Sequence, residues 1–220
     1  MSPVWRPDAP TASNPPLPAA HTPDPRRGPP HYAVVDTTFS TVDMGAVAVA
    51  TLKQQGIDAS RIHRLTVPGF KDLAVACKRL IEQGCSIAIA CGMPGPEPID
   101  KQCGHEASLS IGEAQLATST HILEVFVHMD EAATDAELIA VCNNRVAEHA
   151  INAYWLVERP DELVKRAGTG QRQGFADLGP ADAKKADAGH LRAAGAVHTR
   201  KAGKAPKPAK AKGAASRKKR

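Results

Sequence analysis

The chain has 220 residues, of which 42% are hydrophobic and 23% charged, and it carries a formal net charge of +5 at pH 7. This charge is unevenly distributed, because residues 181–220 contain 13 Lys and Arg against 2 Asp, whereas residues 31–180 contain 12 Lys and Arg against 19 Asp and Glu. A nucleic-acid-binding protein with a basic folded core is therefore excluded, and the lack of an 18-residue apolar run excludes a membrane-spanning helix.

The composition divides the chain into three segments. Residues 1–30 hold 10 of the 18 prolines and no periodic apolar pattern, so we expect a disordered, Pro-rich extension. Residues 181–220 consist mainly of Ala, Lys, Gly and Pro and predict a disordered basic tail, which either contacts nucleic acid weakly or is simply solvated. Residues 31–180 form the predicted core domain. Its Gly-rich end, 161–180, is predicted to be an irregular C-terminal arm that packs on another surface, such as a neighbouring subunit.

The first half of the core alternates apolar segments with amphipathic ones. Residues 32–35 predict a first strand, and a helix capped by Thr41 or Asp43 follows it. Residues 61–67 alternate between polar and apolar side chains, which predicts a second strand near an edge of the sheet. Apolar residues at helical spacing over 70–81 predict the second helix.

The second half repeats this order. The almost wholly apolar run 86–91 predicts a strand covered on both faces, and a helix is expected over 100–118 after a Pro-rich loop. Residues 122–127 predict the fourth strand, and a long final helix opens at Thr134 or Asp135. Since parallel strands need helical crossovers of one hand, the order predicts an α/β fold: a doubly wound, four-stranded parallel sheet in an α-β-α sandwich.

The cysteines indicate a reducing compartment. They are odd in number, widely spaced and without a C-x-x-C pair, which favours reduced, buried thiols over a disulfide framework. The N-terminus also lacks the apolar segment of a secretory signal, so the expected location is the cytoplasm. The five residues are Cys77, Cys85, Cys91, Cys103 and Cys142.

A polar loop rich in Pro, Gly or aromatic residues follows each predicted strand. These loops span residues 36–39, 67–72, 92–97 and 127–130. The carboxyl ends of parallel strands lie along one edge of a sheet, where ligands of such folds bind. The pattern therefore predicts one composite site for a small molecule.

The first two loops offer binding groups. Phe39 suits a stacking platform for a planar heterocycle, although it would also serve to pack the first helix. Pro68 and Gly69 lead into a helix whose free N–H groups can bind a hydroxyl or carbonyl oxygen. Lys71 and Asp72 lie in its first turn, where Asp72 would alternatively only complement the helix dipole.

Titratable residues near the other two loops are candidates for proton transfer. Glu97 and Lys101 lie beside the Pro-rich loop, and His128 follows the fourth strand, where backbone hydrogen bonding is its alternative role. His105 has either a polar, catalytic role or a packing role in its helix. Cys103 and His105 lack the spacing of a metal site, so no metal ligands are assigned.

Other motifs narrow the function. Arg145 belongs to a polar face of the last helix, which either faces solvent or reaches a partner's site in an oligomer. The chain contains no G-x-G-x-x-G, Walker or G-x-S-x-G sequence, which disfavours nucleotide-cofactor enzymes and serine hydrolases.

Residues 31–180 resemble the archaeal-type riboflavin synthases, which are relatives of lumazine synthase. The resemblance covers the core and neither tail, and Ala74 departs from it where related sequences often have proline. It rests on VVDTTFSTVDM (34–44), TVPGFKDLAVACKRL (66–80), GMPG (92–95), DKQCGHEASL (100–109), EVFVHMDEA (124–132), RVAEHA (145–150) and AGTGQRQGFADLGP (167–180).

This resemblance implies a lumazine synthase-like fold with flavodoxin-like strand order, and a homopentamer with active sites between subunits. The implied reaction is a dismutation of two 6,7-dimethyl-8-ribityllumazine molecules to riboflavin and 5-amino-6-ribitylaminouracil. It requires no redox cofactor, although Mg²⁺ or another divalent cation is a suggested aid. The implied substrate-binding residues are Thr38, Phe39, Ser40, Pro68, Gly69, Phe70, Lys71, Asp72, Gly92, Met93, Pro94 and, from the adjacent subunit, Arg145. The implied proton-transfer residues are His128, His105, Lys101 and Glu97, in no fixed order.

Two other functions on the same fold remain open from the sequence. Lumazine synthase normally carries G-T-V-I-R-G-x-T-x-H after its third strand, whereas this chain has GMPGPEPID at 92–100 and lacks that Arg and His. A non-catalytic protein that binds lumazine or flavin on the same fold is the second alternative. A nucleic-acid-associated protein directed by the basic tail is a more distant third.

Overall fold

The computed structural model describes residues 28–181 and contains a four-stranded, all-parallel sheet with strand order β2-β1-β3-β4. The predicted parallel sheet and its flavodoxin-like order are confirmed. The predictions for 1–30 and 181–220 lie outside the described residues, apart from 28–30 and 181. The strands are β1 (Tyr32–Thr37), β2 (Ile62–Val67), β3 (Ile87–Gly92) and β4 (Ile122–Phe126).

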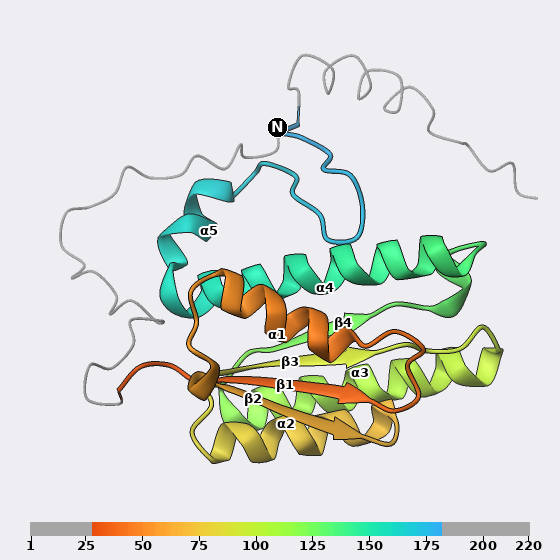
Figure 1. The fold of residues 1–220 in the computed structure, drawn as a ribbon, viewed down its shortest axis with the longest axis horizontal. Helices are drawn as coiled ribbons and strands as arrows, with labels where there is room; N and C mark the ends of the chain where they lie inside the picture. Colours follow the sequence, from red (N-terminus) through yellow and green to blue (C-terminus); the bar gives the residue numbers. More distant parts are fainter. Residues whose placement is uncertain (1–27, 182–220) are drawn as a thin grey trace, which may run out of the picture. The chain divides into compact units, whose positions relative to one another are not determined.

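Helices cover both faces of the sheet (Figure 1). On one face lie α1 (Met44–Gln54) and α4 (Asp135–Glu158), and on the other lie α2 (Leu73–Glu82) and α3 (Pro98–Thr118). The predicted doubly wound α-β-α sandwich is therefore confirmed. Three short 3₁₀ turns complete the connections: η2 (Ala59–Arg61), η3 (Phe70–Asp72) and η4 (Met129–Glu131).

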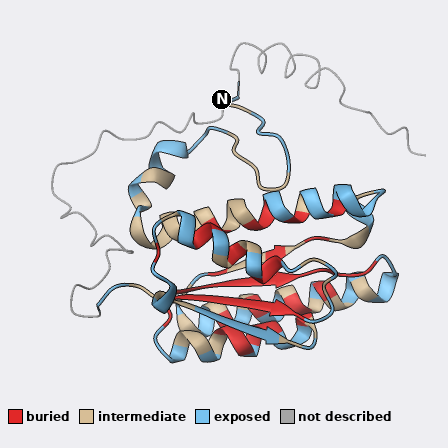
Figure 2. Ribbon diagram, in the orientation of Figure 1, coloured by how far each residue is buried: buried red, intermediate tan, exposed pale blue. Residues whose placement is uncertain are grey.

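Burial follows the position of each strand in the sheet. All residues of the central strands β1 and β3 are buried, whereas the edge strand β2 has no buried residue (Figure 2). The alternating sequence of β2 had predicted this edge position. The core consists of two apolar clusters, one between the sheet and α1 and α4, the other between the sheet and α2 and α3. Four of the five cysteines are buried and all five are unpaired.

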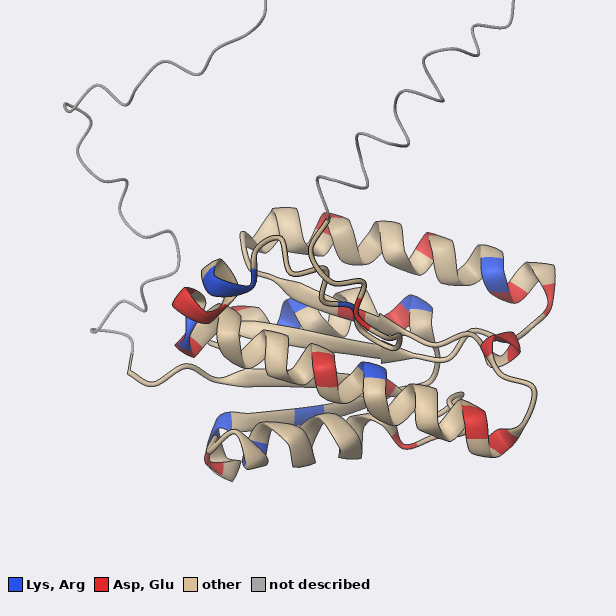
Figure 3. Ribbon diagram, turned by 90° about the horizontal axis from the view of Figure 1, so that it is seen from above, with Lys and Arg blue, Asp and Glu red and all other residues tan. Residues whose placement is uncertain are grey.

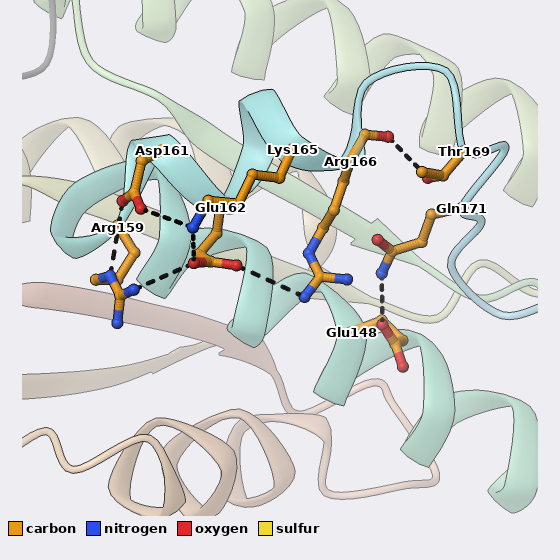
Figure 4. A network of polar contacts seen from close by, with 8 residues as sticks. All are labelled: Glu148, Arg159, Asp161, Glu162, Lys165, Arg166, Thr169 and Gln171. Atoms are coloured by element: carbon orange, nitrogen blue, oxygen red, sulfur yellow. Dashed lines mark hydrogen bonds and ion pairs between the residues drawn. The ribbon is translucent and has the colours of Figure 1, made fainter.

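The prediction that residues 161–180 are wholly irregular is wrong for the first part of this segment. A fifth helix, α5, spans Pro160–Arg166. Proline suits the first turn of a helix, and acidic residues in the first turn with basic ones in the last complement the helix dipole. Lys165 forms ion pairs with Asp161 and Glu162, and Arg159 binds the same two carboxylates (Figure 4). Residues 167–181 contain neither helix nor strand.

The charged residues do not form one basic surface in the view of Figure 3. Lys and Arg lie beside Asp and Glu, most visibly around α5. This arrangement agrees with the acidic composition of the core. Among the described helices, none combines the length and the hydrophobicity that a bilayer crossing requires.

His149 on α4 makes folding sensitive to acid. Burial, with Arg145 nearby, lowers the pKa of His149 to about 4, below its ordinary value of 6.5. Between these two values the unfolded chain binds a proton that the folded chain does not, so the free energy of unfolding must fall as the pH falls. We expect a loss of about 2 kcal/mol between pH 7.5 and pH 5 from this one residue.

Urea unfolding of the wild type and of His149→Gln at these two pH values measures that loss. Carboxylates of the protein also titrate over this pH range. The relevant quantity is therefore the difference in lost stability between the wild type and the variant. The variant should lose less stability on acidification by about the amount stated. Equal losses in both proteins would contradict a neutral, half-buried His149.

Candidate active site

The four loops that follow the strands lie along one edge of the sheet and are bonded to one another. The Thr38 N–H donates to the Val67 carbonyl at 2.9 Å, and the Thr38 hydroxyl donates to the Pro68 carbonyl at 3.1 Å. On the other side, the Met129 N–H donates to the Pro94 carbonyl at 3.0 Å. The loop after β1 is thus joined to the loop after β2, and the loop after β3 to the loop after β4. The loops therefore meet at one edge as the topology predicts, and the binding of a small molecule there stays a prediction.

Three phenylalanines from three strand ends form an aromatic cluster at this edge. The ring of Phe39 meets that of Phe70 edge-on, with centroids 6.1 Å apart, and Phe70 lies 6.2 Å from Phe126. Phe70 is buried, whereas Phe39 is 47% exposed. The buried ring of Phe70 supports that of Phe39, so Phe39 offers an apolar face to a ligand.

Phe126 was not predicted as part of the site, and a glycine explains its position. A Cβ on Gly92 would come within 2.8 Å of the Phe126 ring, so only glycine at the end of β3 leaves room for that ring. An aromatic residue at the last position of a strand was the available signal in the sequence.

Two ion pairs fix the charged groups around the cluster. Lys71 pairs with Glu106 of α3, and Lys101 of α3 pairs with Asp130 of η4. The hydrogen bond from Lys71 lowers the pKa of Glu106, and the bond to Glu106 raises the pKa of Lys71. The hydrogen bond from Lys101 likewise lowers the pKa of Asp130. Lys71, Glu106 and Asp130 therefore stay ionised at neutral pH, which suits orientation of a substrate better than proton exchange.

Asp72 and Glu97 differ from these paired groups. Both are exposed, at η3 and at the start of α3, and their side chains make no hydrogen bond or ion pair within the described part of the chain. They remain available to bind hydroxyl groups of a ligand.

His128 lies two residues after the end of β4 and is held through its backbone. Its N–H donates to Glu131 Oε1 at 2.8 Å. The ring nitrogen Nδ1 is buried and has no hydrogen-bond partner among residues 28–181. Buried polar atoms are rarely left unpaired without a functional reason, so this nitrogen is suited to share a proton with a ligand.

Glu124 was missed by the sequence reasoning. This residue of β4 accepts a hydrogen bond from the Ser108 hydroxyl at 2.8 Å, and burial raises the pKa of Glu124 above its ordinary value, while His105 and His128 act in the opposite direction. A carboxyl group with a raised pKa is a candidate for proton transfer. An acidic residue in an otherwise apolar strand was the signal.

The remaining predicted residues are placed as follows. The Ser40 and Thr37 hydroxyls lie 2.9 Å apart beside the first loop, and His105 lies exposed on α3. Gly92, Met93 and Pro94 are buried, and the Met93 sulfur accepts a hydrogen bond from Thr41 at 3.2 Å. Met93 therefore has a packing role in this chain, and its assignment to substrate binding stays a prediction.

Arg145 lies in the interior and not on a solvent-facing polar face. It is buried, and it bonds to groups of its own chain at the end of β4. Residues 171–175 cover the surrounding part of α4, where Gln171 contacts Glu148 and Gly174 contacts Asn144 (Figure 4 shows the first contact). Its predicted reach into a neighbouring subunit remains untested.

The suggested aid of a divalent cation stays a prediction. Within the described range, no group of three or more His, Cys, Asp or Glu side chains is arranged to hold a metal ion. The carboxylates of Glu106, Asp130 and Glu131 are already paired with cationic side chains. No step of the chemistry is therefore assigned to a metal.

Comparison with known proteins identifies the family. Residues 30–161 match the sequence profile of 6,7-dimethyl-8-ribityllumazine synthase. A protein named riboflavin synthase from Methanothermobacter thermautotrophicus is 51% identical over 148 residues, which cover 67% of this chain and 96% of the relative. Riboflavin synthases from Archaeoglobus fulgidus and Aeropyrum pernix are each 43% identical over 148 residues, which cover 67% of this chain and 95% of each relative. The chain therefore belongs to the 6,7-dimethyl-8-ribityllumazine synthase family, in which it groups with the archaeal-type riboflavin synthases.

Proposed function

We propose that this protein is a riboflavin synthase, a transferase that moves a four-carbon unit between two molecules of 6,7-dimethyl-8-ribityllumazine. The products are riboflavin and 5-amino-6-ribitylaminouracil. The observation that carries this proposal is the identity of 43–51% to proteins named riboflavin synthase along at least 95% of their length. The exposed ring of Phe39, which packs on Phe70, supports this proposal as a surface for a flat heterocycle.

Lumazine synthase is the less favoured function. The family profile bears its name, but the loop after β3 reads GMPGPEPID and lacks the Arg and His that lumazine synthases normally have there. A Cβ on Gly95 of this loop would lie 2.2 Å from Asp100 Oδ2, so a larger side chain at this position would displace Asp100. A non-catalytic carrier is also less favoured, since the curated relatives are named as enzymes.

The site can perform this chemistry with few groups. A lumazine ring accepts electrons itself, which makes its 7-methyl group acidic, so the protein must align two rings and move protons. Phe39 supports one ring, and the exposed groups of the second loop, including Asp72, bind the ribityl chain. His128 takes or returns the methyl proton through the unpaired Nδ1, and Glu124 is a second candidate for the return step.

Three finer properties belong to the same proposal. The exposed Leu109 and Leu116 on α3 support self-association, and we propose a homopentamer with sites between subunits. Buried, unpaired cysteines favour a reducing compartment, and we propose the cytoplasm. The reaction is proposed to need no cofactor. Weak contact of the basic tail with nucleic acid stays a prediction for residues outside the described range.

Turnover with a single substrate tests the function. The purified protein is incubated with 6,7-dimethyl-8-ribityllumazine alone, and products are separated and quantified. We expect riboflavin to form with about one mole per two moles of lumazine consumed, which is the stoichiometry of the dismutation. Formation of lumazine from a ribitylaminouracil and a four-carbon phosphate, without riboflavin formation, would identify the protein as a lumazine synthase instead.

A further inference from the structure

Arg145 is the one buried lysine or arginine among residues 28–181, with 8% of its surface exposed. Its guanidinium donates to the Phe126 carbonyl at 2.7 Å and to Glu131 Oε1 at 2.8 Å, and a second nitrogen pairs with Glu131 Oε2. A two-point contact of this kind fixes orientation as well as position. Arg145 on α4 therefore holds both ends of the segment 126–131, which contains His128.

Glu131 transmits this restraint to His128. The same Oε1 atom that accepts from Arg145 also accepts the His128 N–H at 2.8 Å. Burial opposes ionisation of Glu131, but the hydrogen bonds from Arg145 and the His128 N–H keep the pKa of Glu131 below its ordinary value. Because His128 Nδ1 has no partner in the described residues, the ring depends on its backbone for orientation.

A C-terminal loop, residues 170–178, closes over the guanidinium. The loop is shut by a hydrogen bond from the Leu178 N–H to the Gly170 carbonyl at 3.0 Å, and Figure 1 shows it descending onto α4. The Gly174 N–H donates to Asn144 Oδ1 at 2.9 Å. A Cβ on Gly174 would lie 2.5 Å from Arg145 Nε, and its φ is +78°, so the close approach requires glycine.

Phe175 of this loop places its ring over the Arg145 guanidinium. Its ring lies 5.4 Å from Arg145 Cζ and 4.6 Å from Arg172 Cζ, within the range of cation–π attraction. This attraction adds to the hydrogen bonds that hold the Arg145 guanidinium in place. Phe175 nevertheless stays 58% exposed, so its removal leaves the core unchanged.

We propose that Arg145 is a positioning residue for His128, and that residues 170–178 hold the Arg145 guanidinium in place through the Phe175 ring. This inference rests on the proposed function only for its kinetic consequence. Positioning of His128 by Arg145 can be distinguished by kinetics from direct binding of the substrate by Arg145. Loss of a substrate contact raises KM, whereas loss of positioning lowers kcat with little change in KM.

Phe175→Ala is the test variant, and Leu178→Ala is the matched control. Leu178 belongs to the same loop and is 74% exposed, and its side chain lies outside the contacts with Arg145. We expect Phe175→Ala to lower kcat about fivefold while KM for 6,7-dimethyl-8-ribityllumazine changes less than about twofold. Phe175→Tyr should restore kcat, because it keeps the aromatic face, and Phe175→Leu should not.

Hydrogen–deuterium exchange supplies a readout that does not require turnover. The peptide containing residues 126–131 should exchange faster in Phe175→Ala than in the wild type, and at the wild-type rate in Leu178→Ala. If the wild type shows no turnover, the proposed function is wrong, and exchange alone decides whether the loop holds this segment. Equal exchange in all proteins, or an effect of Phe175→Ala confined to KM, overturns the inference.

Discussion

The His128→Ala variant is expected to lose about 10² to 10⁴ in kcat, which is the range that a positioned acid or base contributes. His128 lies two residues after the end of β4, and its Nδ1 is buried without a hydrogen-bond partner in the described residues. Alanine removes that nitrogen but leaves the N–H that donates to Glu131, so the loop should keep its conformation. Steady-state formation of riboflavin measures kcat and KM, and KM should change far less than kcat.

His63→Ala is the control for this experiment. His63 is also exposed at the sheet, but it stacks on His31 near the amino end of β2, at the opposite edge from the site. Its variant should retain wild-type kinetics. A His128→Ala protein with kcat within threefold of the wild type would remove His128 from the proton-transfer step.

Phe39→Ala is expected to lower kcat/KM by about 10- to 100-fold, since stacking on an aromatic ring contributes about 1–3 kcal/mol per base-like ring. Phe39 is 47% exposed and contacts Phe70 by its edge, so truncation removes the platform and little of the core. The free energy of unfolding should therefore change by less than about 1 kcal/mol.

Phe39→Tyr and Phe39→Leu test whether the aromatic face of Phe39, and not only its bulk, is needed for turnover. Phe39→Tyr keeps the aromatic face, so kcat/KM should stay within about threefold of the wild type, whereas Phe39→Leu should resemble alanine. The kinetic constants and urea unfolding of the three variants are measured together. If leucine supports normal turnover, the ring at this position only packs the first helix, which was the alternative open from the sequence.

The fold could be predicted because each element has a local signal. The apolar run at β3 marks a strand covered on both faces, and the alternation at β2 marks an edge strand; both signals depend on nearest neighbours in the sequence. The helix α5 was missed because seven residues give too short a pattern to stand out beside Gly168 and Gly170. Its proline and paired charges were nevertheless visible.

The order of the strands predicted which loops lie together at the site, but not which side chains are in contact there. Parallel strands place their following loops along one edge, which identified the segments of Phe39, Phe70 and His128 without any knowledge of contacts. The contact of Phe126 with Gly92 depends on the register of β3 and β4, and the sequence does not contain that register. The burial of Arg145 depends on residues 170–178 folding back onto α4, which is a contact between distant parts of the chain.

A crystal structure of the protein with riboflavin bound tests the central claim most directly. The claim is that the carboxyl edge of the sheet binds the flat heterocycle. We predict that the isoalloxazine ring lies against the side chain of Phe39, with the ribityl chain towards Asp72 and with His128 within hydrogen-bonding distance of a ring or methyl position, from the same or an adjacent subunit. A flavin bound away from these three residues, such as against α5 or at the amino edge of the sheet, would contradict it.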